Sequence, residues 1–324
     1  MRAFKTLLCI PVFIIFTISA LAQNPDVLYE PVSYDFILRQ ALQGNIPMSR
    51  FATYPLSLKT LKKYDAQTGD EAFKKYIFDY YAPIIDTSTE DKTIHLFENY
   101  RNRVRGVWYS DSLLKIQADL GGMLQATAFK SEGNNGEFIG LGRVSGRVMG
   151  NYADFFEFYF DFSNGKKLQG SAETARIIDP FLKRSLKFNI EKQEYFDNYI
   201  GYVQAQYKDL RLRFGRENIS HGYSPIDNLV FSLKAAPADG LVIDFPYKWL
   251  RFATTHSTVE GVNVLTSQPV SSKFIATHRL AFDPVNWLSF AFSEMMVYSG
   301  RGVDFTYLNP VAFLTSAGLG SIER

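Results

Sequence analysis

Apolar and polar residues alternate with a period of two along most of the chain after about residue 113. Phe156, Phe158, Phe160 and Phe162, for example, are separated by Glu, Tyr and Asp. The same alternation recurs at 116–128, 203–207, 210–214, 274–282 and 288–293. A period of two places successive side chains on opposite faces of a β-strand. This part of the chain therefore predicts a mainly β fold with one apolar and one polar face.

Clusters of turn-forming residues separate these runs. They lie at 131–136, 163–166, 208–209 and 283–286, and Ser, Asn, Asp, Gly and Pro are frequent in them. The pattern predicts antiparallel strands of about ten residues, joined by tight turns and by longer polar loops.

The region before the alternation has the period of a helix. Apolar residues recur at helical spacing after Ser33, and Ser57 and Asp70 are suitable N-caps for two further helices, the second of which ends at Pro83. These helices would form either a small bundle or a plug or periplasmic appendage of the sheet. The pattern divides the chain into a helical N-terminal region, 23–108, and a β region, 109–324.

The first 22 residues, 1–22, have the features of a secretory signal peptide. Arg2 and Lys5 precede an apolar run from Leu7 to Leu21, and small residues at Ala20 and Ala22 occupy the positions that a signal peptidase recognises. The run is shorter than the roughly 20 residues that a membrane-spanning helix needs. Cleavage after Ala22 would remove the formal net charge of +2 and the only Cys of the chain.

Composition narrows the class of protein. The 324 residues include 35 basic and 33 acidic side chains, which excludes the strong positive charge typical of nucleic-acid binding. Aromatic residues are abundant, with 28 Phe, 19 Tyr and 3 Trp, while only 21% of residues are charged. Two classes fit, a soluble β-sandwich or β-solenoid and an antiparallel transmembrane β-barrel. A polar face rich in Arg, Gln and Asp favours the barrel, located in the cell outer membrane.

The sequence offers little catalytic chemistry. The four His residues lack the spacing of a zinc site, and no Gly-x-Ser-x-Gly motif is present. The glycine-rich stretch 140–146 lacks the following helix that a phosphate loop needs, and glycines in a strand more often relieve crowding. We therefore expect no catalytic residue, no metal ion and no cofactor.

Polar residues are densest in the segments after residue 213. The candidate site comprises Arg216, His221, Asp239, Arg279, Glu294, Arg301, Asp304 and Asn309. By strand parity, Arg213 and Arg279 would project into the barrel interior. These side chains would either brace the interior by pairing with one another or bind an uncharged or acidic polysaccharide, with tyrosine rings as stacking faces for sugars.

Several blocks of the sequence resemble Wzi-type capsule assembly proteins. The matching blocks are 35–47 and 54–57 near the N-terminus, 214–216, 221–223, 229–232 and 236–239 in the centre, and 278–280, 292–294, 298–304 and 307–310 near the C-terminus. The sequence departs from the family at 221–223, where His-Gly-Tyr replaces a Trp-Gly-Pro-like turn.

The resemblance implies a many-stranded outer-membrane β-barrel with helical plugging elements, which acts as a lectin and retains capsular polysaccharide or exopolysaccharide on the cell surface. Outer-membrane lipid and polysaccharide export machinery are the implied partners, and nucleic acid is not. The match places the candidate residues in equivalent blocks without assigning sugar contacts to them. A diffusion channel and an enzyme acting on lipid or glycan through Glu294 or Asp304 are the alternative functions.

The length differs from what the resemblance implies. About eighteen strands need on the order of 300 residues, whereas the region after residue 108 suffices for only about twelve or thirteen. The last residues, 318–324, also lack the aromatic residue that usually ends a bacterial barrel. We therefore expect the chain to be the front portion of a longer protein, with the closing strands missing.

Overall fold

The structure is a computed structural model of the chain. It describes residues 91–316 except 101–102, 131–135, 154, 184, 208–209, 222–229, 232–235, 263–268, 286–287, 301 and 310–311, together with residues 39, 42–43 and 53–54. The predicted signal peptide and nearly all of the predicted helical segment 33–83 lie outside the described residues. Within that segment, Arg39 and Leu42 are helical.

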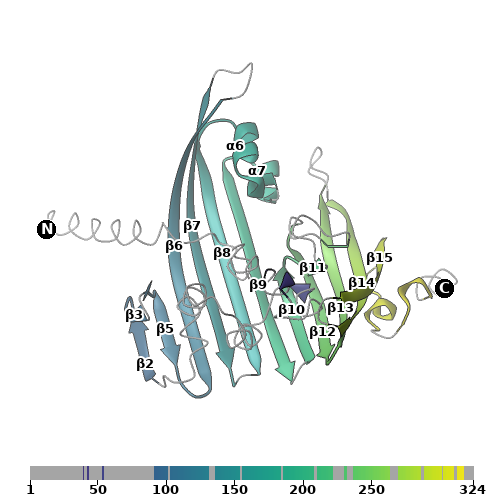
Figure 1. Cartoon of the computed structure of the whole chain (residues 1–324). Helices are drawn as coiled ribbons and strands as arrows, with labels where there is room; N and C mark the ends of the chain where they lie inside the picture. The colour runs from purple at the N-terminus through teal and green to yellow at the C-terminus, as the bar shows by residue number, and fades with distance from the viewer. Residues whose placement is uncertain are drawn as a thin grey trace. The chain divides into compact units, whose positions relative to one another are not determined.

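An 11-stranded, mostly antiparallel sheet dominates the described residues (Figure 1). Hydrogen-bonded neighbours follow the order β15-β14-β13-β12-β10-β9-β8-β7-β6-β5-β2, so most strands pair with the next strand along the chain. The sheet comprises β2 (Asp91–Leu96), β5 (Val107–Ser110), β6 (Leu114–Phe129), β7 (Glu137–Tyr152), β8 (Phe156–Gln169), β9 (Tyr195–Tyr207), β10 (Leu210–Glu217), β12 (Ala238–Tyr247), β13 (Leu250–Val262), β14 (Pro269–Val285) and β15 (Leu288–Ser299). The prediction of a mainly β, antiparallel fold is confirmed.

Two short strand pairs accompany this sheet. β1 (Thr53–Tyr54) pairs with β11 (Ser220–His221), and β3 (Asn99–Tyr100) pairs with β4 (Arg103–Val104). Among the described residues, no helix has both the length and the apolar character needed to cross a membrane.

The chain divides into two compact units. The first comprises residues 118–148 and 160–199, together with 1–27, which are not described. The second comprises residues 28–117, 149–159 and 200–324.

Helices lie between β8 and β9 in the first unit (Figure 1). They are α6 (Ala172–Ile178), the 3-10 helix η1 (Pro180–Lys183) and α7 (Leu186–Ile190). The α6 helix begins at Ser171, whose side chain accepts a hydrogen bond from the Thr174 N–H. A buried apolar cluster joins the helices to β7 and β9, and it contains Ile139, Leu141, Ala175, Leu182, Phe188 and Phe196. The sequence pattern missed these helices because each is only one or two turns long.

The turn predicted at 163–166 is wrong. These residues lie within β8, although Ser, Asn and Gly are common in turns. Gly165 fits the strand because it leaves space for Phe196, whose ring would lie 2.2 Å from a Cβ at this position. Gly146 in β7 has a similar role, since a Cβ there would lie 2.5 Å from the ring of Phe162. The expectation that these strand glycines relieve crowding is thus confirmed at Gly146.

Hairpins in the second unit follow the predicted pattern more closely. Tyr207 pairs with Leu210, so β9 ends and β10 begins on either side of the two residues for which a tight turn is predicted. Val285 pairs with Leu288, so β14 continues through three of the four residues of the turn predicted at 283–286. The backbone N–H of Asp283 donates to the Trp249 carbonyl at 2.8 Å and so extends the strand into the predicted turn.

Strands also begin before the predicted boundary at residue 108. β2 pairs with β5, and the His95 ring stacks on Trp108 with 3.8 Å between ring centroids. The expected all-helical character of 23–108 therefore does not extend to residues 91–104. A six-residue strand next to two-residue strands gives too little alternation to be recognised in the sequence.

Candidate functional site

The sheet of the second unit has two faces of opposite character. Neighbouring residues of β10 define them, because Phe214 is 65% exposed and Arg213 is 4% exposed. The apolar face carries the exposed side chains Val203, Leu210, Leu212, Phe214, Phe245 and Leu280, and the polar face carries the buried side chains Gln204, Arg211, Arg213, Asp244, Arg251, Thr255, Thr277 and Arg279. Charged residues are rarely buried in proteins that fold in water, so this distribution is inverted.

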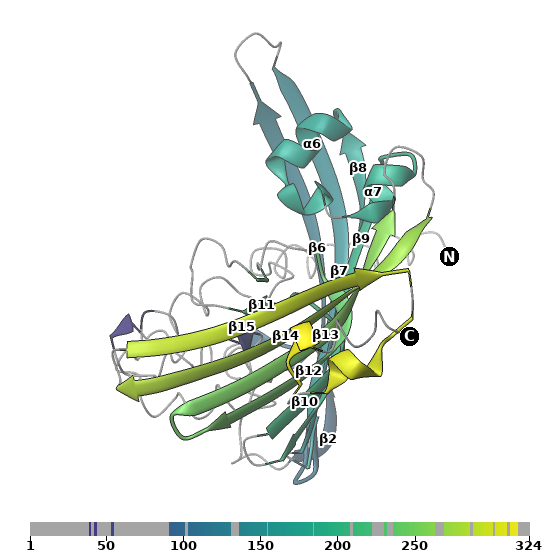
Figure 2. The same cartoon turned by 90° about the vertical axis from the view of Figure 1, so that its right-hand side faces the viewer.

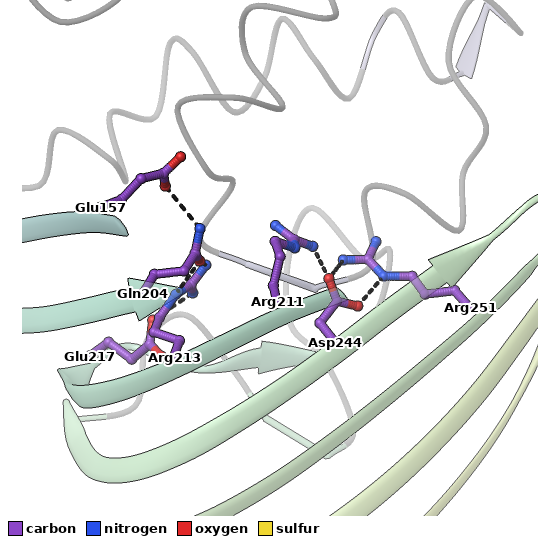
Figure 3. Close-up of polar contacts among 7 residues, drawn as sticks. All are labelled: Glu157, Gln204, Arg211, Arg213, Glu217, Asp244 and Arg251. Atoms are coloured by element: carbon purple, nitrogen blue, oxygen red, sulfur yellow. Dashed lines mark hydrogen bonds and ion pairs between the residues drawn. The ribbon is translucent and has the colours of Figure 1, made fainter. Parts of the chain in front are cut away.

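An aspartate between two arginines forms one buried network on the polar face (Figure 3). Arg211 and Asp244 are directly opposite each other on β10 and β12, and Arg211 Nη2 donates to Asp244 Oδ2. Arg251 of β13 donates from Nε to Oδ1 at 2.6 Å and from Nη2 to Oδ2 at 3.0 Å. A single carboxylate thus accepts hydrogen bonds from two guanidinium groups.

A second buried network extends from β8 to β10 (Figure 3). Arg213 donates from Nε and Nη2 to Gln204 Oε1 at 2.9 and 2.6 Å, and from Nη1 to Glu217 Oε2 at 2.8 Å. Gln204 Nε2 in turn donates to Glu157 Oε2 at 2.8 Å. The guanidinium also lies 4.9 Å from the centre of the Tyr202 ring. Arg213 and Gln204 together thus link β8, β9 and β10.

These two networks brace the polar face. Their charged groups contact groups of opposite charge or amides, and their geometry fixes the side chains in place. All seven members of these networks were absent from the predicted site. Strand parity could have found Glu157, Gln204, Arg211 and Arg213, since these four lie on the polar side of alternating runs.

The structure brings two predicted site residues together. Arg216 and Asp239 are directly opposite each other on β10 and β12, and Arg216 Nη1 donates to Asp239 Oδ2 at 2.8 Å. Their side chains are 25% and 47% exposed, respectively. Strand parity places this ion pair on the same face as Phe214, where β10 ends and β12 begins, and unlike the buried networks it is accessible to a polar ligand.

His221 lies in the segment that connects β10 and β12, outside the large sheet. It is buried, its Nε2 lies 3.0 Å from Thr255 Oγ1, and its ring packs 5.4 Å from that of Phe231. Burial, together with the positive charges of Arg279 and Arg251, lowers the pKa of His221 to about 3. A neutral, buried imidazole supports packing of this segment and is not positioned to contact a ligand from solvent.

Replacing His221 with Gln is expected to reduce the acid sensitivity of the fold. The unfolded chain binds a proton at this residue below a pKa of about 6.5, whereas the folded chain does not until about pH 3, so stability falls as the pH drops between these values. From pH 7.5 to pH 5 the natural protein should lose about 2 kcal/mol more than the variant. Urea unfolding at both pH values measures this difference. Equal losses of stability in the natural protein and the variant would contradict a neutral, buried His221.

The remaining predicted residues do not form one site. Arg279 Nη1 donates to Ser293 Oγ at 3.0 Å on the polar face. Because alternate residues of a strand face opposite sides, Glu294 lies on the apolar face, with Oε1 3.2 Å from His278 Nδ1. Asp304 caps the 3-10 helix η2 (Phe305–Leu308) and Asn309 ends it. Arg301 lies outside the described residues.

Metal ligation and similarity to known proteins are the two remaining questions about this site. Within the described part of the chain, no three His, Cys, Asp or Glu side chains are grouped so that they could hold a metal ion. No family model matches this chain, and no match occurs among curated proteins or solved structures. The resemblance to Wzi-type proteins therefore stays a prediction.

Proposed function

We propose that this chain contributes to the wall of an outer-membrane β-barrel that binds surface or capsular polysaccharide and helps to attach it to the cell. The inverted sheet is the observation that carries this proposal. In lipid, large apolar side chains on the outside are favourable, while polar side chains are directed to an interior that contains water or protein. Aromatic abundance and the signal-peptide pattern support the same location.

Two features support polysaccharide as the ligand. The blocks that resemble Wzi-type proteins include both members of the accessible Arg216–Asp239 pair. A guanidinium and a carboxylate together supply planar donors and acceptors, which suit the hydroxyl and carboxylate groups of sugars. On the proposed barrel this pair lies on the outer face beyond Phe214, at the end of β10, which places it at the edge of the membrane. The buried networks on the opposite face hold its strands in register.

Membrane location is tested by cell fractionation. The protein should be recovered in the outer-membrane fraction and should migrate differently in gel electrophoresis before and after heating, as folded barrels do. Recovery in the periplasmic fraction would contradict the proposal.

Replacing Arg216 with Gln is expected to reduce polysaccharide retention on the cell surface by roughly tenfold, because a hydrogen bond to a charged group contributes about 1.5–3 kcal/mol. Cells that lack the natural gene are complemented with each variant, and the surface-bound polysaccharide is quantified. Lys192→Gln, which removes one exposed positive charge in a turn, is the matched control. Asp239→Asn serves as a second variant if the first does not reach the membrane. Unchanged retention in a correctly inserted variant would contradict the assigned site.

A further inference from the structure

Polar side chains interrupt the apolar face at β13 to β15. His278 lies opposite Thr254 and Glu294 in the strand register, and His256 lies opposite Leu241 and Ala276. On β10 and β12 the same face carries large apolar side chains such as Phe214 and Phe245. Imidazole and carboxylate groups exposed to hydrocarbon would be strongly unfavourable, so this polar patch needs partners and a cover.

Hydrogen bonds within the patch satisfy part of this need. His256 Nε2 lies 2.7 Å from Tyr298 Oη, and His278 Nδ1 lies 3.2 Å from Glu294 Oε1. The rings of Phe274 and Tyr298 stack beside them, with 5.1 Å between their centroids. The patch is therefore an organised arrangement of side chains on three neighbouring strands.

Residues 303–309 and 312–316, which we call the C-terminal cover, lie on this patch. Both views show the segment beside β13 to β15 (Figures 1 and 2), and η2 contacts β13. The backbone N–H of Asp304 donates to Tyr298 Oη at 3.0 Å, and that of Leu314 donates to Glu294 Oε1 at 3.1 Å. Tyr307 and Leu314 are almost completely buried in one cluster with Phe274, Ala276 and Tyr298.

The other side of the cover is apolar and exposed. Phe305 is 79% exposed, Phe313 is 75% exposed and Val303 is also exposed. Exposed aromatic side chains of this size are unfavourable in water but suit the hydrocarbon or the interface of a bilayer. The inner side of the cover thus donates hydrogen bonds to the polar patch, and its outer side is apolar.

We propose that the C-terminal cover is a lipid-facing part of the barrel's outer surface, which shields the polar patch and inserts Phe305 and Phe313 into the bilayer. Over β13 to β15, the cover then supplies the apolar surface that the strands supply elsewhere. This inference rests on the proposed membrane location, because it requires the apolar face to meet lipid.

Single-cysteine variants test the proposal, since cleavage after Ala22 would leave a chain without Cys. Phe305→Cys and Phe313→Cys are labelled with an environment-sensitive fluorophore and folded into phosphatidylcholine vesicles whose acyl chains carry nitroxide quenchers. Both positions are highly exposed, so neither substitution removes a packed side chain. Phe214→Cys reports the apolar face of β10, and Ser112→Cys, in the exposed turn after β5, reports water.

Quenching at 305 and 313 within twofold of that at 214, with little quenching at 112, is the expected result. Strong quenching at 214 combined with background values at 305 and 313 would overturn the lipid-facing cover and leave the membrane proposal intact. Background values at 214, 305 and 313 together would overturn both. The pattern at these four positions therefore separates the two failures.

Discussion

Replacing Asp244 with Asn is expected to destabilise the folded protein by about 3–5 kcal/mol, the usual effect of breaking a buried ion pair. Asp244 is the carboxylate that Arg211 and Arg251 share, and all three side chains are buried. Without its charge, two guanidinium groups would remain buried close together, on the two strands β10 and β13 that flank β12. Their mutual repulsion adds to the unfavourable desolvation of each one.

Urea unfolding of the vesicle-inserted protein, followed by tryptophan fluorescence, measures this effect. Asp197→Asn is the matched control, because it makes the same chemical change at an exposed position of β9 and should alter stability by less than about 0.5 kcal/mol. If Asp244→Asn does not insert, the triple change Arg211→Met, Asp244→Leu and Arg251→Met should restore insertion, because it removes all three charges together. A stable Asp244→Asn protein would show that the network does not brace the sheet.

Strand alternation predicted much of the sheet correctly, because a period of two is a direct consequence of strand geometry. It placed Leu212 and Phe214 on one face and Arg213 on the other, as the structure has them. It also located the boundary between β9 and β10, where Lys and Asp interrupt two alternating runs.

Other features depend on contacts that no local pattern contains. Gly165 continues a strand because of the Phe196 ring beside it, which lies 31 positions away in the sequence. The buried networks join residues from different strands, so individual sequence runs show each charge without its partner. The eight predicted site residues are not all grouped together, because positions such as Arg279 and Glu294 lie on opposite faces of the sheet.

Replacing Leu212 with Arg is expected to destabilise the inserted protein by about 1–3 kcal/mol, because arginine on the lipid face of a barrel costs about 2–4 kcal/mol at the middle of the bilayer and less toward its surfaces. Leu212 is exposed and is the third of the eight residues of β10, so the substitution creates no steric clash. On a surface in contact with water, the same change would alter stability by less than about 0.5 kcal/mol. Ser112→Arg, in the turn after β5, is the control and should be nearly neutral.

The fraction of each variant in the heat-modifiable folded form, together with its urea midpoint, measures this effect. Equal stability of the Leu212→Arg and Ser112→Arg proteins would mean that the apolar face does not contact lipid.

Lipid contact along β10 tests most directly whether the apolar face of the sheet meets the bilayer and the polar face does not. Cysteines at 212 and 213 are labelled and placed in vesicles that contain acyl-chain nitroxide quenchers. We expect strong quenching at position 212 and little at position 213, because these neighbours lie on opposite faces of one strand. Equal quenching at the two positions, or stronger quenching at 213, would contradict lipid contact by the apolar face.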